Sequence, residues 1–158
     1  MVILCAEETE TLLFDEPAVV IGVGSSNVIR TISNLLLNNR IDKTTPILNI
    51  GLAGSTKYPV GSIISVNKCI RQHNQFDKLE YELDVITDIA DTCITADSFL
   101  EDGSDIPLVD MELYYLLSFG LNVKAIKVVS DNLNFNDYSV FNHQAVREEL
   151  NSIISRIS

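Results

Sequence analysis

The segment Ile47-Leu-Asn-Ile-Gly-Leu-Ala-Gly54 joins a strongly apolar run to two closely spaced glycines. Its first part, residues 47–51, is typical of a strand that is buried on both faces of a sheet. Further segments are interpreted as strands for the same reason: residues 2–6, 18–23, 62–70, 85–95 (one or two strands), 108–109 and 124–129. Strands of this kind, separated by helices, are typical of α/β proteins.

Three segments between and after these strands have helical periodicity. Residues 25–38 place Val28, Ile29, Ile32, Leu35 and Leu36 on one face, and the serines with Asn27 are positioned to cap the start. Residues 112–119 are also expected to be helical, and residues 144–157 form an amphipathic pattern. The pattern predicts a three-layer α/β/α sandwich around a central mixed, largely parallel sheet. The length of 158 residues suits a single domain spanning residues 1–158.

The charge balance excludes several classes of function. The chain has 22 acidic residues against 11 lysines and arginines, a formal net charge of −11. A nucleic-acid binder needs a basic face for phosphates, and an anionic membrane would repel this chain in the same way, so neither partner is expected. No apolar run approaches the ~20 residues of a membrane helix, and the N-terminus lacks the pattern of a signal peptide.

The cysteines and histidines indicate neither disulfides nor metal. Cys5, Cys69 and Cys93 form no C-x-x-C pair and are interpreted as buried free thiols of a cytoplasmic protein. His73 and His143 have no cysteine nearby, so a zinc site is not expected. No metal or cofactor is implied.

Unusual residues follow the predicted strands, where α/β folds gather their ligands. They are Glu7, Glu8 and Glu10, the turn Gly22-Val-Gly-Ser-Ser-Asn27, the turn Asn49-Ile-Gly-Leu-Ala-Gly54, Val109-Asp-Met-Glu112, and Ser130-Asp-Asn132. Each alone also fits a simpler interpretation, such as a helix cap at Asp110, a polar turn at Asp131 or a solvated face at Glu7–Glu10. Together they predict three carboxylate sites and two small-residue turns at one edge of one sheet.

At this point the chain resembles the nucleoside phosphorylase/nucleosidase superfamily, and most closely the 5′-methylthioadenosine/S-adenosylhomocysteine nucleosidases. The resemblance rests on five motifs in the expected order: Asn49-Ile-Gly-Leu-Ala-Gly54, Val60-Gly-Ser-Ile-Ile64, Ala96-Asp-Ser-Phe99, Val109-Asp-Met-Glu112 and Val128-Val-Ser-Asp131. The family breaks the N-glycosidic bond of a nucleoside through an oxocarbenium-like transition state, for which carboxylates are well suited.

The resemblance implies a role for each site residue. Asp131 would be the general acid that protonates the departing purine, oriented by Ser130, and Glu10 would position the attacking water. Glu112 would hold the ribose 2′- and 3′-hydroxyls, with Met111 under the sugar. Phe99 would stack on the base, and the backbone near Leu100 would read the edge of the base. Ala53 and Gly54 would allow close approach of the substrate.

Water is favoured over phosphate as the nucleophile. Phosphorolysis needs cations to hold phosphate, and Asn49 stands where the family's phosphorylases often have arginine. Ser25, Ser26 and Asn27 have no adjacent cation, and Arg30 is one helical turn away. A phosphate-dependent phosphorylase nevertheless stays an alternative, because neutral hydroxyls and amides can also hold phosphate.

A third alternative is a nucleoside-binding or regulatory module without catalysis. Only residues 11–17 separate Glu10 from the second strand, where the family normally has a β-hairpin, and Leu52 replaces a small residue in its turn. Lys127 stands where the nucleosidases commonly have arginine. The resemblance also implies a homo-oligomer, with a dimer favoured.

Overall fold

A computed structural model describes residues 1–72 and 79–158, so His73 lies outside the described residues. An eight-stranded sheet forms within the described part of the chain. Its strands are β1 (Val2–Cys5), β2 (Ala18–Val20), β3 (Ile47–Gly54), β4 (Ile63–Arg71), β5 (Tyr81–Glu82), β6 (Ala90–Thr95), β7 (Leu108–Asp110) and β8 (Val123–Asp131). The elements between and after the strands are η1 (Glu8–Leu13), α1 (Ser25–Leu37), α2 (Leu113–Leu117), α3 (Phe135–Ser139), η2 (His143–Val146) and α4 (Arg147–Ile157).

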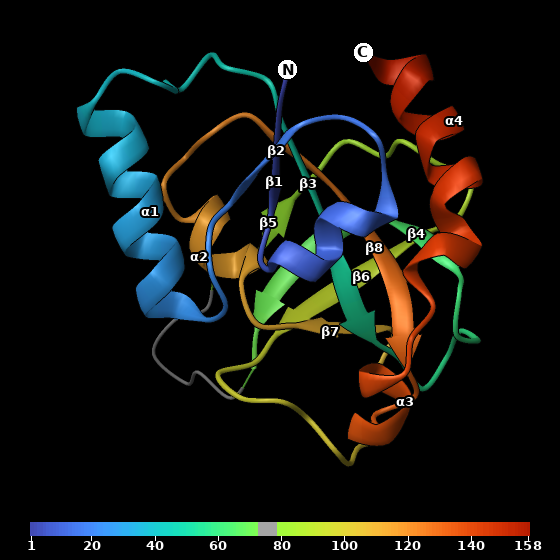
Figure 1. The fold of residues 1–158 in the computed structure, drawn as a ribbon. Helices are drawn as coiled ribbons and strands as arrows, with labels where there is room; N and C mark the ends of the chain where they lie inside the picture. The colour runs from blue at the N-terminus through green and yellow to red at the C-terminus, as the bar shows by residue number, and fades with distance from the viewer. Residues whose placement is uncertain (73–78) are drawn as a thin grey trace.

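The helices cover both faces of the sheet. Helices α1 and α2 lie on one side of it, and α4 lies on the other (Figure 1). This arrangement confirms the predicted α/β fold with helices around a mixed sheet. None of the helices in the described residues is long and apolar enough to cross a bilayer.

The sheet contains both parallel and antiparallel pairs. Strands β2, β1, β3 and β8 run parallel to one another, and β4, β6 and β7 form a second parallel set. Antiparallel pairs β4–β8 and β3–β7 join the two sets, so β3, β8, β4, β6 and β7 form a closed ring. The ring brings the end of β7 to the end of β3, where Gly54 pairs with Val109.

The two large clusters of the core lie on opposite faces of the sheet, because successive strand residues point to opposite faces. A third, small cluster contains Ala96, Val109 and Leu133. On β3, Leu48 and Ile50 pack in the cluster that contains Leu150 of α4. Ile47 and Ala53 of the same strand pack in the cluster of α1 and α2. Complete burial of each such aliphatic side chain contributes about 1.5–3 kcal/mol, so both layers hold the sheet in place.

The structure corrects the expected start of α1. Its first turn follows Gly24, and neither the serines nor Asn27 caps it through a side chain. The Asn27 side chain instead donates to the Val23 carbonyl. It lies against Gly22, where an added Cβ atom would be only 2.6 Å from the Asn27 Cβ, so this position has no room for a side chain. The Gly24 N–H is bound by the Glu112 carboxylate, which is described below.

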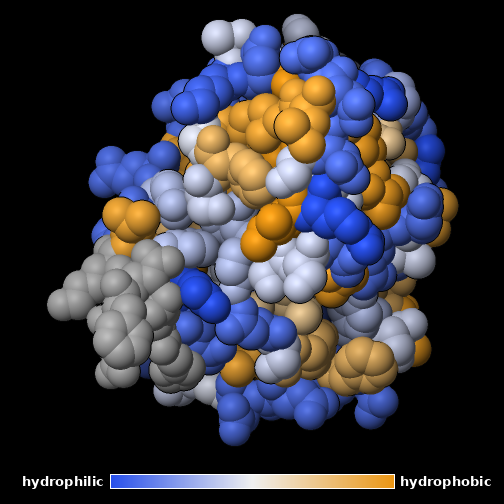
Figure 2. All heavy atoms as spheres, turned by 90° about the vertical axis from the view of Figure 1, so that its left-hand side faces the viewer, coloured by the Kyte–Doolittle hydropathy of each residue, from blue (hydrophilic) through white to orange (hydrophobic). Residues whose placement is uncertain are grey.

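One residue of the predicted apolar face of α1 is exposed. Val28 and Ile32 are buried as expected, but Ile29 is 48% exposed. With Leu37, which is 79% exposed, it adds apolar surface on the α1 side of the molecule, which faces the viewer in Figure 2. The last helix agrees better with its pattern, since Val146, Leu150, Ile153 and Ile154 are all buried.

Strand lengths also differ from expectation. Strand β2 ends at Val20, because its partner strand β1 ends at Cys5. Residues 85–89, which were expected to belong to a strand, form none. Strands β3 and β8 run further than expected, to Gly54 and Asp131. Two short helices that the sequence pattern did not indicate, η1 and α3, follow strands β1 and β8 and carry residues of the site.

Candidate active site

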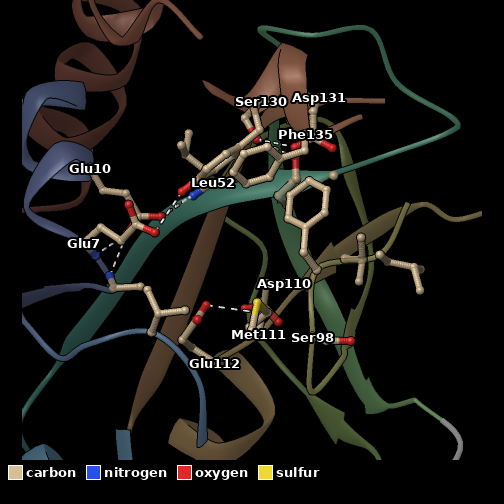
Figure 3. A pocket seen from close by; sticks show the side chains of 18 residues that line it. Glu7, Glu10, Leu52, Ser98, Asp110, Met111, Glu112, Ser130, Asp131 and Phe135 are labelled. Carbon is tan, nitrogen blue, oxygen red and sulfur yellow. Dashed lines mark hydrogen bonds between the residues drawn. The ribbon is translucent and has the colours of Figure 1, made fainter. Parts of the chain in front are cut away.

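A pocket of about 240 Å³ lies where strands β1, β3, β7 and β8 end (Figure 3). All nine predicted site residues line it: Glu10, Ala53, Gly54, Phe99, Leu100, Met111, Glu112, Ser130 and Asp131. The structure therefore brings the separate motifs together around one pocket, although β7 reaches it antiparallel to β3 and not along a shared parallel edge. The structure also brings in Ala6, Glu7, Val23, Leu52, Ser98, Val109, Asp110, Phe135 and Tyr138.

Glu10 is buried on η1 and held by three backbone donors. Its Oε2 accepts from Ala6 N at 2.6 Å and Glu7 N at 3.1 Å, and its Oε1 accepts from Leu52 N at 2.7 Å. Burial raises the pKa of Glu10, while these N–H groups and the charge of Lys127 oppose the rise. The carboxylate is thus fixed in one orientation at the side of the pocket.

The N-terminal half of α4 forms hydrogen bonds to the end of η1 and to the loop that follows it. Arg147 donates to Asp15 and to the Leu12 carbonyl, and Asn151 bonds both the backbone and the carboxylate of Asp15. A helix from a distant part of the sequence therefore holds the segment that follows Glu10. The described chain between Glu10 and β2 contains no strand.

Asp131 ends β8 and lies next to the small residues of β3. Ser130 Oγ donates to Asp131 Oδ2 at 2.7 Å, and Leu133 N donates to Oδ1 at 2.9 Å. A Cβ at Gly54 would lie 3.0 Å from Asp131 Oδ1, so glycine leaves room for this carboxylate. The Ser130–Asp131 contact agrees with the predicted orienting position of Ser130.

Glu112 bridges two segments from its place before α2. Its Oε1 accepts from Gly24 N at 3.0 Å, and its Oε2 accepts from Met111 N at 3.3 Å. Burial, followed by repulsion from Asp110, raises the pKa of Glu112 to about 7, while Lys127 opposes the rise. The carboxyl group thus titrates near neutral pH.

Asp110 and Lys127 form a buried ion pair beneath these groups. Lys127 Nζ lies 2.7 Å from Asp110 Oδ2, and Asp110 also accepts from Thr95 Oγ1 and Leu113 N. The N-cap residue of α2 is Glu112, so Asp110 is not the cap that the simpler interpretation expected, although it accepts the first N–H of the helix and also lines the pocket. Burial alone would lower the pKa of Lys127, but the charges of Asp110, Cys93 and Glu112 raise it above its usual value.

Three aromatic rings form one wall of the pocket. The ring centroids of Phe99, Phe135 and Tyr138 lie 5.4–5.8 Å apart in pairs. Separations of this size are typical of favourable aromatic contacts, so the rings support one another. Phe99 belongs to the predicted motif, and α3 supplies the other two rings.

Sequence reasoning missed Phe135, Tyr138, Glu7 and Asp110 as site residues. A signal for the first two was present, since they stand three apart on a helical spacing just after Asp131. Glu7 and Asp110 directly follow strands, but a solvated face and a helix cap explain them from sequence equally well. For Lys127 the sequence indicates only a lysine where the nucleosidases commonly have arginine.

The pocket is lined by acceptors rather than cations. Five carboxylates line it, from Glu7, Glu10, Asp110, Glu112 and Asp131, and no lysine or arginine is among the described residues that do so. Within residues 1–72 and 79–158, no three His, Cys, Asp or Glu side chains are grouped so as to hold a metal ion. The pocket can therefore bind hydroxyl groups, N–H groups and developing positive charge, and it disfavours anions.

Comparisons with known proteins identify the fold. No protein-family model matches the chain, and no curated protein matches it. Solved structures similar to it include a nucleosidase (MTAN) from Chlamydia trachomatis, with a TM-score of 0.76 and 17% identity over 99% of this chain and 95% of that one. An S-adenosylhomocysteine nucleosidase from Streptococcus pyogenes has a TM-score of 0.78 and 16% identity, covering 99% and 96%. The futalosine hydrolase of Helicobacter pylori has a TM-score of 0.75 and 13% identity, covering 98% and 96%.

The similarity defines the class of fold to which the chain belongs. It has the α/β fold of the 5′-methylthioadenosine/S-adenosylhomocysteine nucleosidases over nearly its whole length, which confirms the predicted fold. At these identities the likeness establishes the fold, and the chemistry of this chain has to be argued from its own pocket.

Proposed function

We propose that this protein is a nucleosidase that hydrolyses the N-glycosidic bond of a purine nucleoside. The observation that carries the proposal is the set of carboxylates from Glu10, Glu112 and Asp131 around one pocket. An oxocarbenium-like sugar carries positive charge, which such a pocket stabilises. Two of the similar structures named above are nucleosidases, which supports a reaction of this class here.

Asp131 and Glu10 serve as the acid and the base in this proposal. Asp131 gives a proton to the purine as the bond between its nitrogen and C1′ breaks, and the bonding electrons leave with the base. Water then forms a bond to C1′ and loses a proton to Glu10. Glu112 accepts hydrogen bonds from the ribose 2′- and 3′-hydroxyls, while Met111 lies under the sugar.

The remaining predicted site residues bind the base. Phe99 stacks on the purine ring, and the backbone near Leu100 contacts its edge. Ala53 and Gly54 lack large side chains and let the substrate approach β3, and Ser130 keeps Asp131 oriented.

The charge of the pocket supports water rather than phosphate as nucleophile. A phosphate would face five carboxylates, and the nearby cation Lys127 is already bound by Asp110. Arg30 is exposed and donates to the Asn27 side chain, so it does not extend into the pocket. No observation on the described residues favours a phosphate site.

The proposal is tested by measuring free base and sugar after incubation with purine and pyrimidine nucleosides. In phosphate-free buffer we expect a free purine and ribose, with no increase in rate when phosphate is added. Base release that depends strictly on phosphate and yields ribose 1-phosphate would identify a phosphorylase. Binding of a nucleoside without any base release would identify a non-catalytic binding module.

We also propose that the chain forms a homodimer in the cytoplasm. Ile29 and Leu37 of α1 are exposed, and a second copy of the chain would cover this apolar surface. Light scattering of the purified protein at several concentrations tests the mass, and a monomer at all of them would contradict the proposal.

A further inference from the structure

Glu7 is a carboxylate of the pocket that the proposed chemistry does not use. It directly precedes η1, and its side chain lines the cavity together with Tyr138. Tyr138 Oη donates to Glu7 Oε1 at 2.8 Å, and Thr9 Oγ1 donates to Glu7 Oε2 at 3.1 Å. The side chain is thus held in place by groups on both of its oxygens.

The Glu7 carboxylate keeps free capacity to accept hydrogen bonds. A carboxylate can accept about four hydrogen bonds, and Glu7 accepts one from Tyr138, one from Thr9 and one from the Glu10 N–H of the capping box, which leaves a position open for a ligand. Glu10 accepts three backbone N–H groups, whereas two of the donors to Glu7 are side-chain hydroxyls. The phenol oxygen of Tyr138 can accept as well, so this part of the pocket is suited to a ligand group that donates.

The position of Glu7 indicates which part of a nucleoside would meet it. Figure 3 shows Glu7 beside Glu10, on the opposite side of the view from Asp131. In the proposed function the base lies at Asp131 and the ribose 2′- and 3′-hydroxyls lie at Glu112. The remaining substituent of the ribose is the 5′ group on C4′, and Glu7 with Tyr138 is the unused polar pair on the sugar side.

We propose that Glu7, held by Tyr138, selects nucleosides whose 5′ group is a hydrogen-bond donor, such as the hydroxyl of adenosine. This inference rests on the proposed function, because it depends on the same orientation of the nucleoside. A 5′-thioether or a 5′-hydrogen cannot donate, and either group would cover the carboxylate without replacing its hydrogen bond to water. The preferred substrate therefore differs from the 5′-methylthioadenosine found in one similar structure from Helicobacter pylori.

The test compares adenosine, 5′-deoxyadenosine and 5′-methylthioadenosine, both as substrates and as ligands. We expect kcat/KM and the calorimetric affinity to favour adenosine over the other two by about 10- to 100-fold, the range of one hydrogen bond to a charged group. Glu7→Leu should bring the ratio close to one, and Glu7→Gln should reduce it. Glu8→Gln serves as the matched control, because Glu8 is exposed and does not line the pocket.

A second variant tests the positioning role of Tyr138. Tyr138→Phe keeps the ring in the aromatic wall and removes the donor to Glu7, so the preference for adenosine should fall while the affinity for 5′-deoxyadenosine changes little. An unchanged preference in both Glu7→Leu and Tyr138→Phe would overturn the inference.

The two proposals fail in different ways. If no nucleoside loses its base but binding still favours adenosine through Glu7, the proposed hydrolysis fails and the selectivity stands. If base is released but 5′-deoxyadenosine or 5′-methylthioadenosine is used as well as adenosine, the selectivity fails and the hydrolysis stands. If none of the three nucleosides binds, the inference is overturned together with the orientation on which it depends.

Discussion

Lys127 Nζ lies 2.7 Å from Asp110 Oδ2, and both side chains are buried beside the pocket. The lysine is only 1% exposed, and its neighbours in β8, Ile126 and Val128, are apolar and fully buried. Its charge lowers the pKa values of Glu10 and Glu112 against the effect of burial. The pair therefore helps a pocket of five carboxylates to exist in a folded protein.

Replacing Lys127 by methionine should destabilise the fold strongly. Methionine fills a similar volume but leaves the buried Asp110 without its cation, a change that typically costs about 3–5 kcal/mol. Chemical denaturation of wild type and Lys127→Met measures the free energy of unfolding. The double variant Lys127→Met/Asp110→Asn should recover part of the loss, because no buried charge is then left unpaired. A single variant as stable as the wild type would contradict the assigned role of the pair.

Glu112 gives the protein a distinct dependence on pH. Its pKa is about 7 in the folded protein and 4.5 as the ordinary value, so the folded state binds the proton more tightly. The stability from this group is thus fully present below pH 4.5 and is lost as the pH rises through 7. At about 1.4 kcal/mol for each unit, the loss reaches about 3 kcal/mol at pH 8.

Glu112→Gln should remove this dependence. The glutamine resembles the protonated acid, so the variant gains stability relative to the wild type as the pH rises from 5 to 8. Denaturation of both proteins at several pH values measures the difference in their free energies of unfolding. A difference in the free energy of unfolding that stays constant over this range would show that the pKa of Glu112 is not raised in the folded protein.

Gly51→Ala should disturb Glu10 more than it disturbs the fold. Gly51 pairs with Lys127 across β3 and β8, and a Cβ there would lie 3.1 Å from Glu10 Oε1 and 3.3 Å from Lys127 Nζ. Both groups must then shift by a few tenths of an ångström. We expect kcat for base release to fall about tenfold or more, because a small displacement of a catalytic group is costly.

Two control measurements compare Gly51→Ala with the wild type: the thermal unfolding midpoint and the affinity for the nucleoside. Both should stay close to the wild-type values while kcat falls. A variant with full activity would mean that Glu10 need not hold its present position.

Much of the fold was predictable because its strands are nearly continuous apolar runs. Residues 47–51 and 124–129 could hardly be anything but central strands, and the pattern of residues 144–157 marks a helix. The closure of the sheet was not predictable, since pairing of β3 with β7 depends on distant contacts. The exposure of Ile29 was not predictable either, because it depends on which segments pack against α1 and not on the helical spacing of the apolar residues.

The site was predictable where a residue directly follows a strand. Glu10 and Asp131 could be grouped because β1 and β8 belong to one parallel set, whose strand ends share one edge. Glu112 follows β7, which is antiparallel to β3, and it reaches the pocket through the closure of the sheet. Tyr138 reaches the pocket through a short helix with weak local pattern, and it contacts Glu7 across a separation of 131 residues. Lys127 could not be assigned because nothing in its strand indicates that a buried carboxylate faces it.

The most direct measurement is the rate at which purine is released from adenosine by the wild type and by Asp131→Asn in phosphate-free buffer. Asparagine keeps the shape of Asp131 but cannot give up a proton, so we expect release to fall by about 10²- to 10⁴-fold. Asp102→Asn, which is exposed and outside the pocket, should match the wild type. Absence of base release from any nucleoside by the wild type, or full turnover by Asp131→Asn, would contradict the account.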